Sequence, residues 1–219
     1  MNKKQIFSTN PNTHGNAYLN WRMCKEDDSE NLYQMGCAYG YGAKLLLKDC
    51  LSNNFDYRAD ALIFPIMFGI NQYIELSAKS IIRKFEIIDD AEIKQKPTHD
   101  ISSLLSQLKD IIKSHRNGDD DGLDKHLEPV QSYIDELYPL IKSEKGKPHI
   151  DYARYPMDTD GNSFFYVSYE NVTVDLTNLN ERFLLIMDAI DSLYYYCIGE
   201  QDLKNEMISM DDMRDYGDY

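Results

Sequence analysis

The stretch ALIFPIMFGINQYIELSAKSIIRKF, residues 61–85, decides the fold of this 219-residue chain. Its first half is apolar on most faces, and polar residues enter mainly in the second half. This pattern predicts a long helix over about residues 60–86 that is central and buried. Pro65 has no backbone N–H, so we expect it either in the first turn of this helix or at a kink.

Further helices are expected around the central one, because apolar residues recur elsewhere at three- and four-residue steps. The pattern predicts helices over residues 29–50, 101–115, 123–142 and 179–200. In the first of these, Gly36 and Gly40 lie one turn apart and would let a partner helix approach closely. Pro129 is expected early in the helix over 123–142, or as an interruption of it.

The remaining segments complete an all-α bundle of about five helices. The sequence FFYVSYENVTVDL, residues 164–176, predicts a small β-hairpin before the last helix. Residues 1–28 form an irregular arm, 29–200 one helical domain and 201–219 an acidic C-terminal tail that we expect to be mobile. We expect Trp21 to pack the arm against the domain.

Composition and charge narrow the classes of function. Apolar residues make up 42 % of the chain, enough for a core, and the formal net charge of -14 argues against a broad basic surface that binds nucleic acid. Cys24, Cys37, Cys50 and Cys197 lie far apart without metal-ligand spacing. With no secretory signal pattern, reduced thiols in the cytoplasm are expected. No apolar run approaches ~18 residues, so no membrane span is expected.

His99 and Asp100 stand directly before the helix over 101–115, and two roles are open for them. Thr98 or Asp100 can accept a hydrogen bond from a free N–H at the helix start, where a carboxylate also suits the helix dipole. His99 can act as an acid or base, projecting from the backbone that such a cap fixes. The two roles can coexist.

Asn71, Glu75 and Lys79 follow one another at four-residue steps and form a polar line on the central helix. Either this line is a helix edge that meets solvent, or it lines a polar pocket together with His99 and Arg154. Glu75 and Lys79 can pair along the helix. In a buried setting they would need such partners, because an unpaired buried charge is very costly.

Arg154 and Tyr155 lie in the longest irregular stretch, residues 143–163. Arg154 can clamp a phosphate and Tyr155 can stack on a base. Equally, Arg154 can neutralise Glu75 or Asp100 and pin this stretch to the bundle. The sequence MDTDGN, residues 157–162, lacks the glycine and glutamate positions of a calcium loop. It predicts a turn, and we expect neither a metal nor a cofactor.

The order of these signals resembles the HEPN superfamily, the nucleotide-binding helical domains of prokaryotes and eukaryotes. The likeness spans roughly residues 30–200 and is carried by four motifs: YGYGAKLLL (39–47), NQYIELSAKSII (71–82), THDISSLL (98–105) and ARYPMDTDG (153–161). The resemblance implies a homodimeric helical bundle in a toxin–antitoxin or phage-defence context. It also implies metal-independent ribonuclease activity.

The nuclease signature of that superfamily, an arginine followed after four to six residues by a histidine, is absent from the sequence. The nearest pair in that order is Arg116 and His126, with nine residues between them. A ribonuclease without a metal still needs an acid or base near the 2′-hydroxyl and a fixed cation near the phosphate. Any such site in this chain must therefore use other residues.

Two functions from different classes remain open. In the first, a divergent site acts on RNA or nucleotides, with His99 as acid or base and Arg154 as phosphate clamp. Lys79 adds positive charge there, and Glu75 and Asp100 position these groups. In the second, the chain is a non-catalytic module whose acidic surface binds a partner protein with a basic surface. The polar line favours the first, and the net charge and missing signature favour the second.

Overall fold

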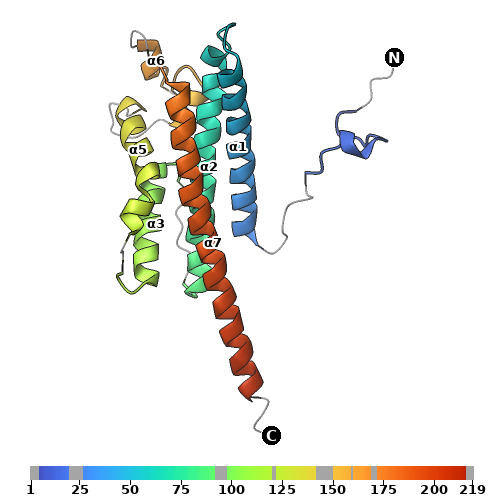
Figure 1. The fold of residues 1–219 in the computed structure, drawn as a ribbon, viewed down its shortest axis with the longest axis vertical. Helices are drawn as coiled ribbons and strands as arrows, with labels where there is room; N and C mark the ends of the chain where they lie inside the picture. The colour runs from blue at the N-terminus through green and yellow to red at the C-terminus, as the bar shows by residue number, and fades with distance from the viewer. Residues whose placement is uncertain are drawn as a thin grey trace.

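The computed structural model describes residues 5–19, 27–91, 98–119, 122–141, 150–158, 160–168 and 172–215. Five longer helices build the bundle in Figure 1: α1 (Asp28–Ser52), α2 (Ala59–Ile88), α3 (Ile101–His115), α5 (Glu128–Ile141) and α7 (Leu176–Asp215). The short elements are η1 (Thr13–Gly15), α4 (Leu123–His126), η2 (Ile150–Ala153) and α6 (Phe165–Ser168). The all-α class is confirmed.

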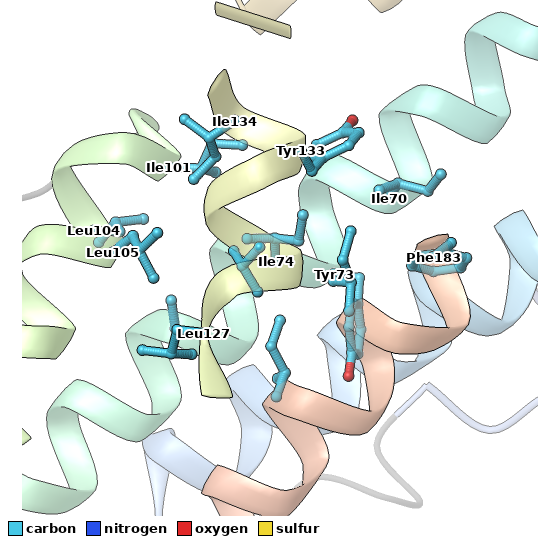
Figure 2. Packing of buried hydrophobic residues seen from close by; sticks show 14 of the residues in the cluster. Ile70, Tyr73, Ile74, Ile101, Leu104, Leu105, Leu127, Tyr133, Ile134 and Phe183 are labelled. Carbon is cyan, nitrogen blue, oxygen red and sulfur yellow. The ribbon is translucent and has the colours of Figure 1, made fainter. Parts of the chain in front are cut away.

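Helix α2 is the centre of the bundle, as its sequence predicts. It packs against α1, α3, α7 and η2. Figure 2 shows Ile70, Tyr73 and Ile74 of α2 among core residues of α3, α5 and α7. Pro65 lies inside α2, six residues after its start and beyond the first turn. The Ala61 carbonyl there has no helical N–H donor, because proline lacks one.

Helices α1 and α2 approach closely where glycines face the partner helix, as expected for Gly36 and Gly40. A Cβ atom built on Gly40 would lie 2.9 Å from Cδ2 of Tyr73, and one on Gly36 would lie 3.0 Å from Oγ of Ser77. From the other side, a Cβ on Gly69 would lie 3.0 Å from Cβ of Ala43. The small residues therefore set the spacing between the two helices.

One carboxylate, that of Asp191, joins α1, α2 and α7. The hydroxyls of Tyr33 and Tyr73 donate to Oδ1 of Asp191 over 2.8 and 2.7 Å. Burial and the nearby carboxylate raise the pKa of both tyrosines well above the usual value, so they remain donors. Tyr33 also stacks on Tyr194, with the ring centroids 3.5 Å apart.

The helix predicted over residues 123–142 is interrupted. Leu127 separates α4 from α5, and Pro129 is the second residue of α5. A proline fits the first turn of a helix because the N–H it lacks would have no intrahelical acceptor. Of the two alternatives for Pro129, an early position in a helix is therefore the observed one, with the interruption just before it.

The predicted β-hairpin is wrong. Phe165–Ser168 forms the short helix α6, and residues 172–175 form no strand. Within the described residues, the bridge between Met157 and Ser163 is the only β pairing. Phe164 is buried and the Phe165 ring packs 5.6 Å from that of Tyr152. Packing of these aromatic rings against the bundle overrides their preference for strands.

Helix α7 is longer than its sequence pattern predicts. Asp175 caps its start by accepting from the N–H groups of Thr177 and Asn178. Its end is Asp215, so residues 201–215 of the expected tail are helical. Lys204 still ties this part of the helix to the bundle, since its Nζ donates to the Ile88 carbonyl over 2.8 Å. Figure 1 shows the helix continuing beyond the other helices.

The described part of the N-terminal arm has little regular structure. Residues 5–19 carry only η1 and are almost all exposed, whereas Trp21 lies outside the described residues.

Among the described helices, α2 is long and apolar enough by length and composition to cross a membrane. Half of its most apolar 18-residue window is buried inside the protein. Central helices of bundles pass the same test, so this is weak evidence for a span.

Candidate functional site

The carboxylate of Glu75 is buried on α2, with 3 % of its side chain exposed. Its Oε1 accepts a hydrogen bond from Nζ of Lys79 over 2.6 Å and lies 2.9 Å from Nδ1 of His99. Gln72 donates to the other oxygen over 3.4 Å. A buried carboxylate needs partners of this kind, because an unpaired charge in the interior is very costly.

His99 is held at one ring nitrogen and open at the other. Its side chain is 84 % exposed although Nδ1 contacts the buried Glu75. A carboxylate only accepts hydrogen bonds, so Nδ1 carries the hydrogen and Nε2 of the neutral ring is left as an acceptor. Nε2 has no partner among the described residues. A histidine oriented in this way can take up or release a proton at Nε2.

Asp100 fixes the backbone from which His99 projects. It is the N-cap of α3, and its Oδ1 accepts from the N–H groups of Ser102 and Ser103 over 3.1 and 3.4 Å. The hydroxyl of Tyr138 donates to the same oxygen over 2.6 Å and ties the cap to α5. The capping role of Asp100 is therefore confirmed, and it coexists with the placement of His99 beside Glu75.

Lys79 adds a positive charge at the same oxygen of Glu75. It lies one turn after Glu75 on α2, and 15 % of its side chain is exposed. Because Lys79 and His99 contact the same carboxylate oxygen, an ammonium group stands next to the imidazole. Three of the residues predicted for a polar pocket thus come together: Glu75, Lys79 and His99.

Asn71 belongs to a different, fully buried network one turn before Glu75. Its Oδ1 accepts from the hydroxyl of Tyr133 over 2.7 Å, and its Nδ2 donates to the hydroxyl of Tyr152 over 3.4 Å. Burial raises the pKa of Tyr152 to about 12 and that of Tyr133 well above its usual value. Asn71 therefore joins α2 to α5 and η2, and its side chain makes no hydrogen bond to His99.

Arg154 and Tyr155 also lie apart from the Glu75–His99 contact. Nη1 of Arg154 pairs with Asp151 over 3.0 Å, and the guanidinium lies over the rings of Phe68 and Tyr155. Phe68 precedes Glu75 by seven residues, which corresponds to about 10 Å along the α2 axis. The interpretation that Arg154 neutralises Glu75 or Asp100 is therefore wrong, because Asp151 is its ion-pair partner.

Sequence reasoning missed a cavity of about 820 Å³ between the first turns of α2 and α7 and the middle of α5. Tyr133 and Tyr152 form part of its wall, so it backs onto the Asn71 network. Its other walls come from α6 and residues 172–176. Residues this far apart in sequence share no common spacing, so the sequence carries no signal for this cavity.

The side chain of Asp158 organises the segment in which the sequence predicts a turn. Oδ1 of Asp158 accepts from the N–H groups of Asp160 and Asn162, and Gly161 has a φ of 82°, so this segment is the predicted turn.

Cys37, Cys50 and Cys197 are free thiols, while Cys24 lies outside the described residues. Within the described part of the chain, no group of three or more metal-ligating side chains gathers.

Comparison with known proteins found no matching family model, no matching curated protein and no matching solved structure.

Proposed function

We propose that this chain is a HEPN-like protein that acts on RNA or nucleotides through a metal-independent acid–base site centred on His99. The observation that carries the proposal is the contact of 2.9 Å between the buried Glu75 carboxylate and Nδ1 of the exposed His99. A carboxylate in this position selects the tautomer whose Nε2 accepts a proton and stabilises the imidazolium that results.

The proposed reaction is attack of a ribose 2′-hydroxyl on the adjacent phosphorus. Nε2 of His99 removes the hydroxyl proton, the 2′-oxygen bonds to phosphorus, and the bond to the 5′-oxygen of the next nucleotide breaks. The leaving 5′-oxygen takes up a proton from water, and His99 releases its own proton to solvent. The products are a 2′,3′-cyclic phosphate and a 5′-hydroxyl. Lys79 supplies positive charge for the phosphate as charge develops there.

Arg154 and Tyr155 have roles farther along the strand in this proposal. Arg154 binds a neighbouring phosphate of the strand, and Tyr155 stacks on a base. The distance of about two turns of α2 between Phe68 and Glu75 suits contacts to different nucleotides of one strand. The cytoplasmic location, the homodimer and the defence or toxin–antitoxin context belong to the same proposal through the HEPN resemblance.

The experiment is incubation of the purified protein with single-stranded RNA in the presence of a chelator. His99→Ala is expected to lower the cleavage rate by about 10²-fold or more, since this is the contribution of a positioned acid or base. His14→Ala is the matched control, because it removes an exposed histidine on the N-terminal arm. Equal cleavage by both variants would refute the role of His99.

A second candidate function is a non-catalytic module that binds a partner protein with a basic surface. It is favoured by the C-terminal part of α7, where Leu203, Met207 and Met210 are more than half exposed on a helix that carries acidic residues. The net charge of -14 suits a basic partner. In a pull-down from the source cell, this function predicts a stoichiometric protein that His99→Ala retains and Leu203→Asp loses. A protein retained by both variants would contradict binding through α7.

A further inference from the structure

We infer that the cavity between α2, α5 and α7 is a binding site for a small organic cation with an apolar body. The cavity of about 820 Å³ lies within the range of roughly 300–1,000 Å³ that small-molecule sites occupy. It is separate from the Glu75–His99 contact, because none of Glu75, Lys79 and His99 lines it.

The walls of the cavity are rich in aromatic rings. Several of these rings contact one another: Phe64 meets Tyr166 at 5.0 Å between centroids, and Tyr152 meets Phe165 at 5.6 Å. The aromatic lining residues are Phe64, Tyr133, Tyr152, Phe165, Tyr166 and Phe183. The face of an aromatic ring attracts a cation electrostatically, and the rings also bury an apolar body.

The charges at the cavity add a negative balance. Asp60, Glu136 and Asp175 line it together with a single arginine, Arg182. Arg182 is already paired, because it contacts the Glu136 carboxylate and donates to Oγ of Ser132 over 2.9 Å. No cationic side chain therefore balances the charges of Asp60 and Asp175: Asp175 accepts backbone hydrogen bonds at the start of α7, and the side chain of Asp60 has no partner among the described residues. They complement a positively charged ligand.

An anion is the weaker fit, although two helix N-termini meet at the cavity. The free N–H groups that make such termini bind anions are occupied here. At α2, the N–H of Ala59 donates to Oδ1 of Asn54 over 2.9 Å. At α7, the N–H groups of Thr177 and Asn178 donate to the carboxylate of Asp175. The negative charges of Asp60 and Asp175 therefore favour a positively charged ligand.

The rim of the cavity offers a way in. Leu140, Val172 and Val174 line it, and they are 40–44 % exposed. Large side chains this exposed at the edge of an apolar cavity leave contact surface that a ligand can cover. An apolar cation therefore enters this cleft from solvent and places its charge near Asp60 and its body against the aromatic rings.

The test uses the full chain and three probes. N-phenyl-1-naphthylamine, a neutral dye that fluoresces in apolar sites, reports occupancy of the cavity. Benzyltrimethylammonium and its uncharged isostere neopentylbenzene then compete for it at low salt. The cation is expected to compete about tenfold better, the ratio that a desolvated cation–π contact supplies. Equal competition, or better competition by neopentylbenzene, would overturn the inference.

Variants locate the site. Asp60→Asn should weaken competition by the cation and leave dye binding unchanged, whereas Asp188→Asn, which removes an exposed charge of α7 outside the cavity, should change neither. Ile63→Trp should fill the cavity and abolish dye binding, with Val172→Trp at the rim as the alternative if Ile63→Trp unfolds. Dye binding that survives both folded tryptophan variants, or equal effects of the two aspartate variants, would contradict the assignment.

Discussion

The spacing of α1 and α2 can be tested by adding one methyl group at Gly40. Its Cβ would lie 2.9 Å from Cδ2 and 3.1 Å from Cγ of Tyr73, closer than a Cβ atom tolerates. The Tyr73 ring cannot swing away, because it is fully buried, its hydroxyl is bound to Asp191 and it forms a T-shaped pair with the ring of Phe183. Overpacking of this kind costs about 1–3 kcal/mol.

Gly42 provides the matched control on the same helix. A Cβ atom there would meet nothing within 4 Å, so Gly42→Ala gains only helix propensity, roughly 0.5–1 kcal/mol. Gly40→Ala receives the same gain. The difference between the two variants in free energy of unfolding therefore isolates the overpacking and should be about 1–3 kcal/mol, with Gly40→Ala the less stable.

The assay is urea unfolding followed by far-UV circular dichroism, with the slope m equal in both variants so that the midpoints report stability. In thermal unfolding the same difference corresponds to about 2–12 °C in Tm for a chain of this size. Gly40→Ala as stable as Gly42→Ala, or more stable, would refute the close approach of the two helices.

Two further predictions concern helix caps. Asp100→Ala should lower the free energy of unfolding by about 1–2 kcal/mol, because α3 loses its N-cap. The control Asp188→Ala, on the exposed face of α7, should change it little. Equal effects of the two variants in a urea titration would argue against the cap. Burial alone would raise the pKa of Asp27, but hydrogen bonds from Ser29 and Glu30 and the charge of Lys84 lower it below its usual value. The stability from this carboxylate is thus present above about pH 4 and lost as the pH falls through the lowered pKa, so the gap in unfolding free energy between wild type and Asp27→Asn should narrow steadily as the pH is lowered below about 4. A gap that persists in acid would contradict this.

The parts of the fold that the sequence predicts are those with strong local signals. The long apolar run places α2 at the centre, and Asp100 with the apolar stripe after it predicts both ends of α3. The signal fails where a tertiary contact competes with propensity. Residues 165–167 are aromatic or β-branched, yet they lie in a helix because the rings of Phe165 and Tyr166 pack against the bundle.

The candidate site shows the same division. The pair Glu75 and Lys79 follows from their spacing of four residues on one helix. The contact of His99 with Glu75 depends on how α3 starts beside α2, and periodicity carries no information on that. Arg154 pairs three residues back, with Asp151, because the 3-10 turn of η2 brings the two side chains together.

Chemical rescue tests the acid–base role of His99 most directly. His99→Ala is incubated with single-stranded RNA and a chelator, with and without added imidazole, beside the wild-type protein. The proposal predicts cleavage by the wild type, its loss in His99→Ala, and its partial return with imidazole, which supplies the missing proton acceptor. Intact RNA with the wild-type protein, or a variant that cuts RNA equally well without imidazole, would contradict it.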